Sequence, residues 1–164
     1  MDVDLGPGNQ LLSGRVLLIG IGNDMRGDDA AGLLVVRRLR EMGVDADFRE
    51  CDGDGAELME LWRDAEEVIL FDAVCSSTPK GTIHRFDASE MPIPTVFRSS
   101  PSTHLFSVAE AIELASSLLR LPPRITVYGI EGSNFTLGSS PSPEVMLAVE
   151  TVVEDVVSHL ASRS

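Results

Sequence analysis

Three carboxylates and one imidazole stand at positions where side chains could do chemistry. Asp28 and Asp29 follow a short apolar run that ends in a glycine turn, Asp72 lies near the end of a second apolar run, and His104 follows a long segment rich in proline and serine. Carboxylates and imidazoles bind metals and also serve as acids and bases. Asp29, Asp72 and His104 together would hold a transition metal on one face and leave positions open, with nickel, zinc and iron all admissible.

These side chains can meet only if the chain forms a parallel sheet. Val16–Ile21 is a run of Val, Leu and Ile with one glycine, as expected of a strand buried on both faces, and residues 68–74 form a second such run. A helix is predicted directly after the first run, with Gly32 on its apolar face and Gly43 at its end. Ligands of parallel sheets gather at the carboxyl ends of the strands, so the acids that follow these strands are expected to converge there with His104.

The remaining elements are read from periodicity and turn residues. Further strands are predicted at residues 46–51, 82–86 and 125–130, and further helices at residues 58–62, 104–119 and 142–160. The strand at 82–86 is expected at an edge of the sheet or in a hairpin. The start of the helix at 104–119 is open, because Ser102 or Thr103 would cap it there, whereas Ser107 and Glu110 have the spacing of a capping box one turn later.

The order of these elements predicts an α/β fold. We expect three layers, with a mostly parallel twisted sheet of about five strands and helices on both faces. Residues 15–164 are predicted to form a single domain, and residues 1–14, rich in glycine and polar residues, a flexible N-terminal tail.

The glycine turn at residues 20–30 has two further interpretations. Gly20 and Gly22 before a helix resemble half of a dinucleotide fingerprint, but the third glycine is missing, and Asp28 and Asp29 would repel a pyrophosphate. Alternatively the two acids cap the helix and complement its dipole, as acids in a first turn usually do, and we expect this of one of them.

Composition restricts the classes of partner. The chain has 164 residues, of which 43% are hydrophobic, and a net charge of −13. This charge argues against nucleic acid and anionic membrane, both of which require clustered Lys and Arg. There is no apolar run of membrane-spanning length and no basic leader, so we expect a cytoplasmic protein. Cys51 and Cys75 are expected to be reduced, buried thiols, and both cysteines, His84 and His159 are expected to have structural roles only.

The order and combination of several short motifs resemble the hydrogenase maturation endopeptidases. The motifs are Gly20-Ile21-Gly22-Asn23, Asp28-Asp29 with Gly32, Phe71-Asp72-Ala73, Ser102-Thr103-His104, Tyr128-Gly129-Ile130-Glu131, and a Ser-Pro-Glu-Val helix start. They extend from about residue 15 to about residue 160. The resemblance implies a twisted, largely parallel sheet between helices. It also implies one cleavage, which removes a C-terminal extension from the precursor of the large subunit of a nickel–iron hydrogenase after nickel insertion.

The resemblance also implies roles for individual residues. Asp29, Asp72 and His104 match the metal-binding positions. A resident catalytic metal and a metal carried in by the substrate would use the same three ligands, and we expect nickel carried in by the substrate. A water on or near the metal would be the nucleophile, and the N–H groups of Gly22 and Asn23, or the metal, would bind the oxyanion. Asp29 stands where many relatives have the longer Glu. The segment 52–55, Asp-Gly-Asp-Gly, differs from the Gly-Gly-Thr pattern common after the second strand.

Two other functions fit the same residues. One is a non-catalytic module that binds metal, or checks nickel, in the same precursor. The other is a sporulation protease of similar fold that acts on small DNA-binding proteins, although its chain is longer. A change in precursor mass on mixing distinguishes cleavage from binding.

Overall fold

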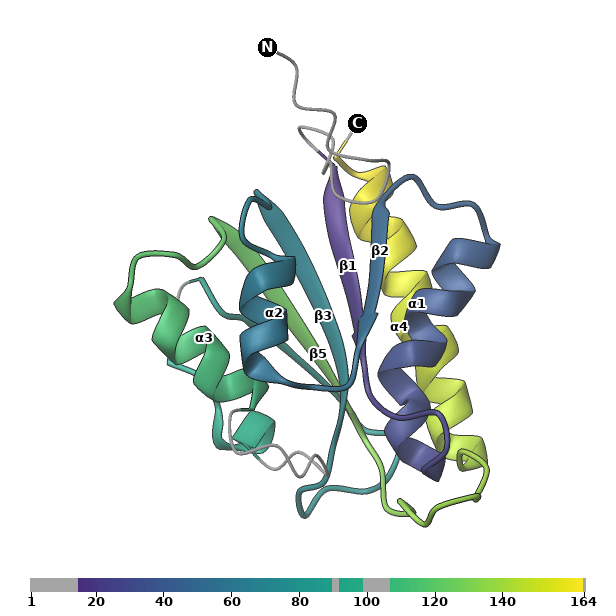
Figure 1. The fold of residues 1–164 in the computed structure, drawn as a ribbon. Helices are drawn as coiled ribbons and strands as arrows, with labels where there is room; N and C mark the ends of the chain where they lie inside the picture. The colour runs from purple at the N-terminus through teal and green to yellow at the C-terminus, as the bar shows by residue number, and fades with distance from the viewer. Residues whose placement is uncertain (1–14, 90–91, 99–106, 164) are drawn as a thin grey trace.

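The computed structural model describes residues 15–89, 92–98 and 107–163. Strands and α-helices alternate along most of the chain, as Figure 1 shows. The strands are β1 (Val16–Ile21), β2 (Asp47–Cys51), β3 (Glu67–Val74), β4 (Ile83–Asp87) and β5 (Arg124–Glu131). The helices are α1 (Ala31–Glu41), α2 (Gly55–Leu61), α3 (Val108–Ser117) and α4 (Pro143–Ala161), with 3-10 turns η1 (Gly27–Ala30) and η2 (Thr95–Arg98). The predicted tail at residues 1–14 lies outside the described residues.

The five strands of the described residues form one sheet in the order β2-β1-β3-β5-β4. Strands β2, β1, β3 and β5 run parallel to one another, and the outermost strand, β4, pairs antiparallel with β5. This agrees with the predicted mostly parallel sheet and with the predicted edge strand. The carboxyl ends of the parallel strands therefore share one edge, which we call the carboxyl edge and which lies at the lower side of Figure 1. The opposite edge is called the amino edge.

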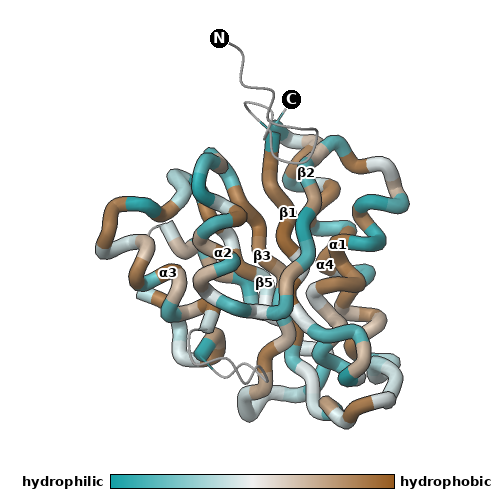
Figure 2. Tube along the Cα trace, in the orientation of Figure 1, coloured by the Kyte–Doolittle hydropathy of each residue, from teal (hydrophilic) through white to brown (hydrophobic). Residues whose placement is uncertain are grey.

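Helices cover both faces of the sheet. In Figure 1, α1 and α4 pack on one face, and α2 and α3 pack on the other. All residues of β1 and β3 are buried, and their side chains alternate between the two apolar layers. Figure 2 shows the corresponding hydrophobic colour along both central strands. The three-layer fold thus places the ends of β1 and β3 at the centre of the carboxyl edge.

Two helix starts differ in detail from the expectation. Ser107 is extended and caps α3, its hydroxyl accepting from the N–H of Glu110 while the Glu110 side chain accepts from the N–H of Ser107. This is the later of the two predicted starts, so the helix does not begin at His104. Ser142 precedes α4 as predicted, but its hydroxyl makes no capping bond to the helix and instead donates to Asp28.

Candidate functional site

Two glycines bring the turn that carries Asp29 directly onto the strand ends. A Cβ added at Gly32 would lie 2.1 Å from the carbonyl oxygen of Phe71 and 2.5 Å from that of Ile21. A Cβ at Gly22, whose φ is +150°, would lie 2.0 Å from the carbonyl oxygen of Asp29. Only glycine permits these approaches. The first turn of α1 therefore rests on the ends of β1 and β3, and η1 holds Asp29 above them.

Asp72 occupies the carboxyl end of β3, at the level where β1 ends. Gly20 of β1 pairs with Phe71, so Asp72 stands level with Ile21, the last residue of β1. Within β3, Asp72 lies on the same face of the sheet as Leu70 and Val74, whose side chains belong to the apolar layer of α2 and α3. Asp72 was predicted to mark the point where the strand leaves the sheet. The strand in fact continues for two more residues and ends at Val74.

Asp29 and Asp72 are both buried, and they lie close enough for the charge of Asp29 to act on Asp72. Burial raises the pKa of Asp72 well above its usual range, and the negative charge of Asp29 raises it further, against a hydrogen bond of 2.9 Å from the N–H of Ala73. Burial also raises the pKa of Asp29, partly offset by the charge of Arg26 and a backbone hydrogen bond from Asn23. Two acids in one buried place disfavour their own ionisation, and a cation between them would reverse this.

The third predicted ligand, His104, lies outside the described residues. Within the described part of the chain, no group of three His, Cys, Asp or Glu side chains is arranged to hold a metal ion. The donor set of Asp29, Asp72 and His104 therefore stays a prediction.

Asp28 has a role that the sequence did not reveal. Its carboxylate is completely buried and accepts hydrogen bonds from the N–H groups of Ser133, Asn134 and Ser142 and from the Ser142 hydroxyl, at 2.6 to 3.0 Å. Burial raises its pKa, but these hydrogen bonds outweigh that effect and lower it overall. The N-cap of α1 is Ala30, and no side-chain hydrogen bond caps this helix, so the expectation that one of the two acids caps it is wrong. Asp28 instead anchors the loop between β5 and α4.

The proposed oxyanion donors in the glycine turn are already engaged. The N–H of Gly22 donates to the carbonyl of Cys51 at 3.0 Å, and that of Asn23 donates to the carbonyl of Asp29 at 3.3 Å. Neither is free to bind a developing negative charge. This part of the predicted mechanism is therefore corrected.

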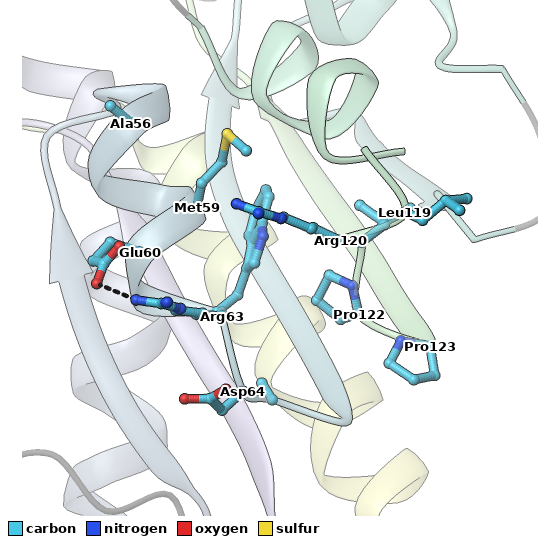
Figure 3. Close-up of a pocket in the computed structure, with 12 residues that line it drawn as sticks. Ala56, Met59, Glu60, Arg63, Asp64, Leu119, Arg120, Pro122 and Pro123 are labelled. Carbon is cyan, nitrogen blue, oxygen red and sulfur yellow. Dashed lines mark hydrogen bonds and ion pairs between the residues drawn. The ribbon is translucent and has the colours of Figure 1, made fainter. Parts of the chain in front are cut away.

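Two cavities differ in their relation to these residues. One of about 610 Å³ lies between the end of α2 and the connection from α3 to β5, with Arg63, Arg120 and Pro122 on its walls (Figure 3). It adjoins the starts of β3 and β5 and so belongs to the amino edge. A cavity of about 270 Å³ lies at the carboxyl ends of β1 and β2, lined by the turn at Gly22 and by Asp52. The smaller cavity adjoins the Asp29 turn.

Comparison with known proteins identifies the family. The model of the hydrogenase maturation protease family, HycI, matches residues 35–159, a range that begins after Asp29 and includes Asp72 and His104. The chain belongs to the hydrogenase maturation protease family. It is accordingly a peptidase.

Individual members of the hydrogenase maturation proteases match almost the whole chain. The hydrogenase 2 maturation protease of Escherichia coli is 27% identical over 152 residues, which cover 89% of this chain and 90% of that protein. The putative hydrogenase maturation protease of Methanocaldococcus jannaschii is 26% identical and covers 88% and 96%, respectively.

Solved structures show the same fold. The [NiFe] hydrogenase maturation protease HybD of Thermococcus kodakarensis is 27% identical, with a TM-score of 0.65, over 90% of this chain and 99% of that one. The maturating endopeptidase HybD of Escherichia coli aligns over 92% and 94%, with a TM-score of 0.73 and 23% identity, and so supports the fold alone.

The residues expected to be structural lie in different surroundings. Cys51 is buried, whereas Cys75 is exposed, so the expectation of two buried thiols is wrong for Cys75. His84 contacts Glu131 at 3.4 Å and His159 contacts Glu67 at 3.1 Å.

Among the described residues, no helix is both long enough and apolar enough to cross a membrane.

Proposed function

We propose that this protease removes a C-terminal extension from the precursor of a nickel–iron hydrogenase large subunit in the cytoplasm, after nickel has been inserted. The observation that carries the proposal is the buried pair of Asp29 and Asp72 at the carboxyl edge of a hydrogenase maturation protease. His104 is proposed as the third ligand, and the nickel is proposed to arrive with the substrate.

The surroundings of the acid pair suit a cation that is not permanently bound but arrives with the substrate. Within the described residues, the hydrogen bond given to the Asp72 carboxylate is that of Ala73, and no arginine or lysine forms an ion pair with it. The raised pKa values of both acids mean that the ionised pair is costly when no cation is present. Such a pair gains most from a divalent ion with open coordination positions.

The chain's own residues would then act mainly by placement. Asp29 and Asp72 would direct oxygen ligands from two different elements at one point, which fixes the precursor's C-terminal region over the carboxyl edge. The bound ion would lower the pKa of a nearby water, the proposed nucleophile. Because the N–H groups of Gly22 and Asn23 already donate to backbone carbonyls, we propose that the cation binds the developing oxyanion.

Mass spectrometry of the precursor tests this function. Nickel-loaded precursor mixed with the protein should lose a C-terminal peptide, and nickel-free precursor should remain uncut, because the open ligand positions are completed only by the loaded substrate. Equal cleavage of both forms would remove the recognition role of Asp29, Asp72 and His104. A stable complex without any change in mass would instead favour the non-catalytic nickel-checking function.

A further inference from the structure

We propose that Glu131 is a positioning residue for this reaction, because the end of β5 clamps together the two segments that carry Asp72 and Asp29. The clamp consists of residues 131–134. The proposal rests on the proposed function of the two aspartates, and it assigns a role to a buried acid that does not itself belong to the candidate ligand set.

One side of the clamp holds the segment that follows Asp72. The Glu131 carboxylate is 1% exposed and accepts from the N–H of Ser76 at 2.5 Å and from the Ser76 hydroxyl at 3.0 Å. The N–H of Gly132 donates to the carbonyl of Val74 at 2.9 Å. Asp72 lies two residues before Val74, so the chain on its C-terminal side is fixed to β5 by both backbone and side chain.

The other side of the clamp holds the segment that precedes Asp29. The N–H groups of Ser133 and Asn134 donate to the Asp28 carboxylate at 2.9 and 3.0 Å. The carbonyl of Asn134 accepts from the N–H of Asp28, also at 2.9 Å. Four consecutive residues of the β5 end thus contact the neighbours of both site acids, and they fix the separation of Asp29 and Asp72.

The chemistry of Glu131 sets it apart from the other buried glutamate of the described residues. Glu67, at the amino end of β3, is contacted by Arg124, His159 and Arg163. Glu131 has one such partner, His84, at 3.4 Å, and its shorter contacts are the neutral donors of Ser76. A buried carboxylate held mainly by neutral donors is a costly way to close a loop, which favours a role in placing the loop.

This contrast supplies a matched pair of variants. In Glu131→Ala, kcat for nickel-loaded precursor should fall at least about tenfold with KM within about twofold, because a displaced site loses rate before it loses binding. In Glu67→Ala, which removes another buried carboxylate from the amino end of the neighbouring strand β3, kcat should stay within about twofold. Glu131→Gln keeps one acceptor oxygen for the Ser76 N–H and should restore most of the lost rate. Equal losses in the two alanine variants would overturn the proposal.

A second readout does not depend on cleavage. The N–H of Ala73 donates to the Asp72 carboxylate, so its hydrogen exchange reports how firmly that side chain is held. Without metal, this amide should exchange about tenfold faster in Glu131→Ala than in Glu67→Ala. If wild-type protein leaves the precursor intact but this difference is found, the proposed function fails and the clamp stands. If the two variants exchange alike at Ala73, the clamp is wrong whatever the cleavage result.

Discussion

At the scale of the residue, Asp28 and Asp29 show how far two adjacent aspartates can differ. Both are buried in the same 3-10 turn. Asp28 accepts four hydrogen bonds, which lower its pKa, whereas burial raises the pKa of Asp29. The fold therefore favours the ionised form of Asp28 and disfavours the ionised form of Asp29. Two residues of the same type, adjacent in the sequence, thus have opposite effects on stability.

Asparagine at each position should change stability in opposite directions. Asp28→Asn replaces an acceptor oxygen by an amide that faces N–H donors, and should cost about 2 to 3 kcal/mol at pH 7. Asp29→Asn removes one charge from the acid pair and should leave the metal-free protein as stable as before, or more stable by about 1 kcal/mol, while abolishing cleavage. Urea unfolding in a chelator measures both. A destabilised but active Asp29→Asn protein would show that the site is wrongly assigned.

The pH dependence of stability in Asp28→Asn and in Asp72→Asn follows from the directions of the pKa shifts. Because the folded-state pKa of Asp28 is lowered, its stabilisation is present above the unfolded value near 3.9 and is lost as the pH falls. Because the pKa of Asp72 is raised, its favourable effect is present below about 3.9 and is lost as the pH rises through the folded value. The stability of Asp72→Asn relative to wild type should therefore rise as the pH increases above about 4, whereas the stability deficit of Asp28→Asn should be full above about pH 4 and shrink as the pH falls below it. Chemical unfolding at several pH values checks this.

The two cysteines should report folding without affecting the site. Burial, and then the charges of Glu57, Asp72 and Asp52, raise the pKa of Cys51 to about 12, whereas Cys75 is exposed. A thiol reagent should therefore label one cysteine in the folded chain and two after unfolding. Cys75→Ala should abolish the rapid labelling and retain cleavage. Loss of cleavage in a folded Cys75→Ala protein would bring this residue into the site.

At the scale of the element, the approach of α1 to the sheet determines where Asp29 can lie. A Cβ at Gly32 would clash with the carbonyl oxygens of Ile21 and Phe71, so only glycine lets α1 lie this close to the sheet, and η1 directly precedes α1. Close packing of this kind makes the helix position as well defined as the strands beneath it.

A methyl group at this contact should therefore be costly. Gly32→Ala should destabilise the protein by about 3 kcal/mol and reduce cleavage, because two backbone carbonyls must shift. Gly43→Ala is the matched control: a Cβ there meets nothing within 4 Å, and the φ of +72° alone should cost about 1 kcal/mol. Urea unfolding and precursor cleavage compare the two. Similar losses would mean that backbone conformation, and not the contact with the sheet, dominates at Gly32.

The elements themselves were largely predictable because their signals are local. Val16–Ile21 and the run before Val74 are buried on both faces and read as continuous apolar strands, and the position of Asp72 near a strand end followed from that. The start of α3 was ambiguous because both candidate starts carry capping residues. The capping box of Ser107 and Glu110 resolved it.

At the scale of the whole molecule, the sequence could not reveal features that depend on contacts between distant segments. Asp28 binds residues more than 100 positions away, and Glu131 binds Ser76, 55 positions away. Nothing in the local sequence around either acid distinguishes it from a helix-end or strand-end charge. The engaged N–H of Gly22 was missed for the same reason, since its acceptor is the carbonyl of Cys51 on the neighbouring strand.

The two edges of the sheet offer different points for attaching the protein to a surface. The last turn of α4 lies at the amino edge, where Arg163 contacts Glu67 at 2.9 Å. Lys80, the one lysine of the sequence, lies in the loop that leaves β3 at the carboxyl edge, 3.6 Å from Glu144. Immobilisation through a C-terminal tag would therefore turn the acid pair toward the solution. Coupling through the lysine amine would turn it toward the support, so an assay on a sensor surface should use the tag.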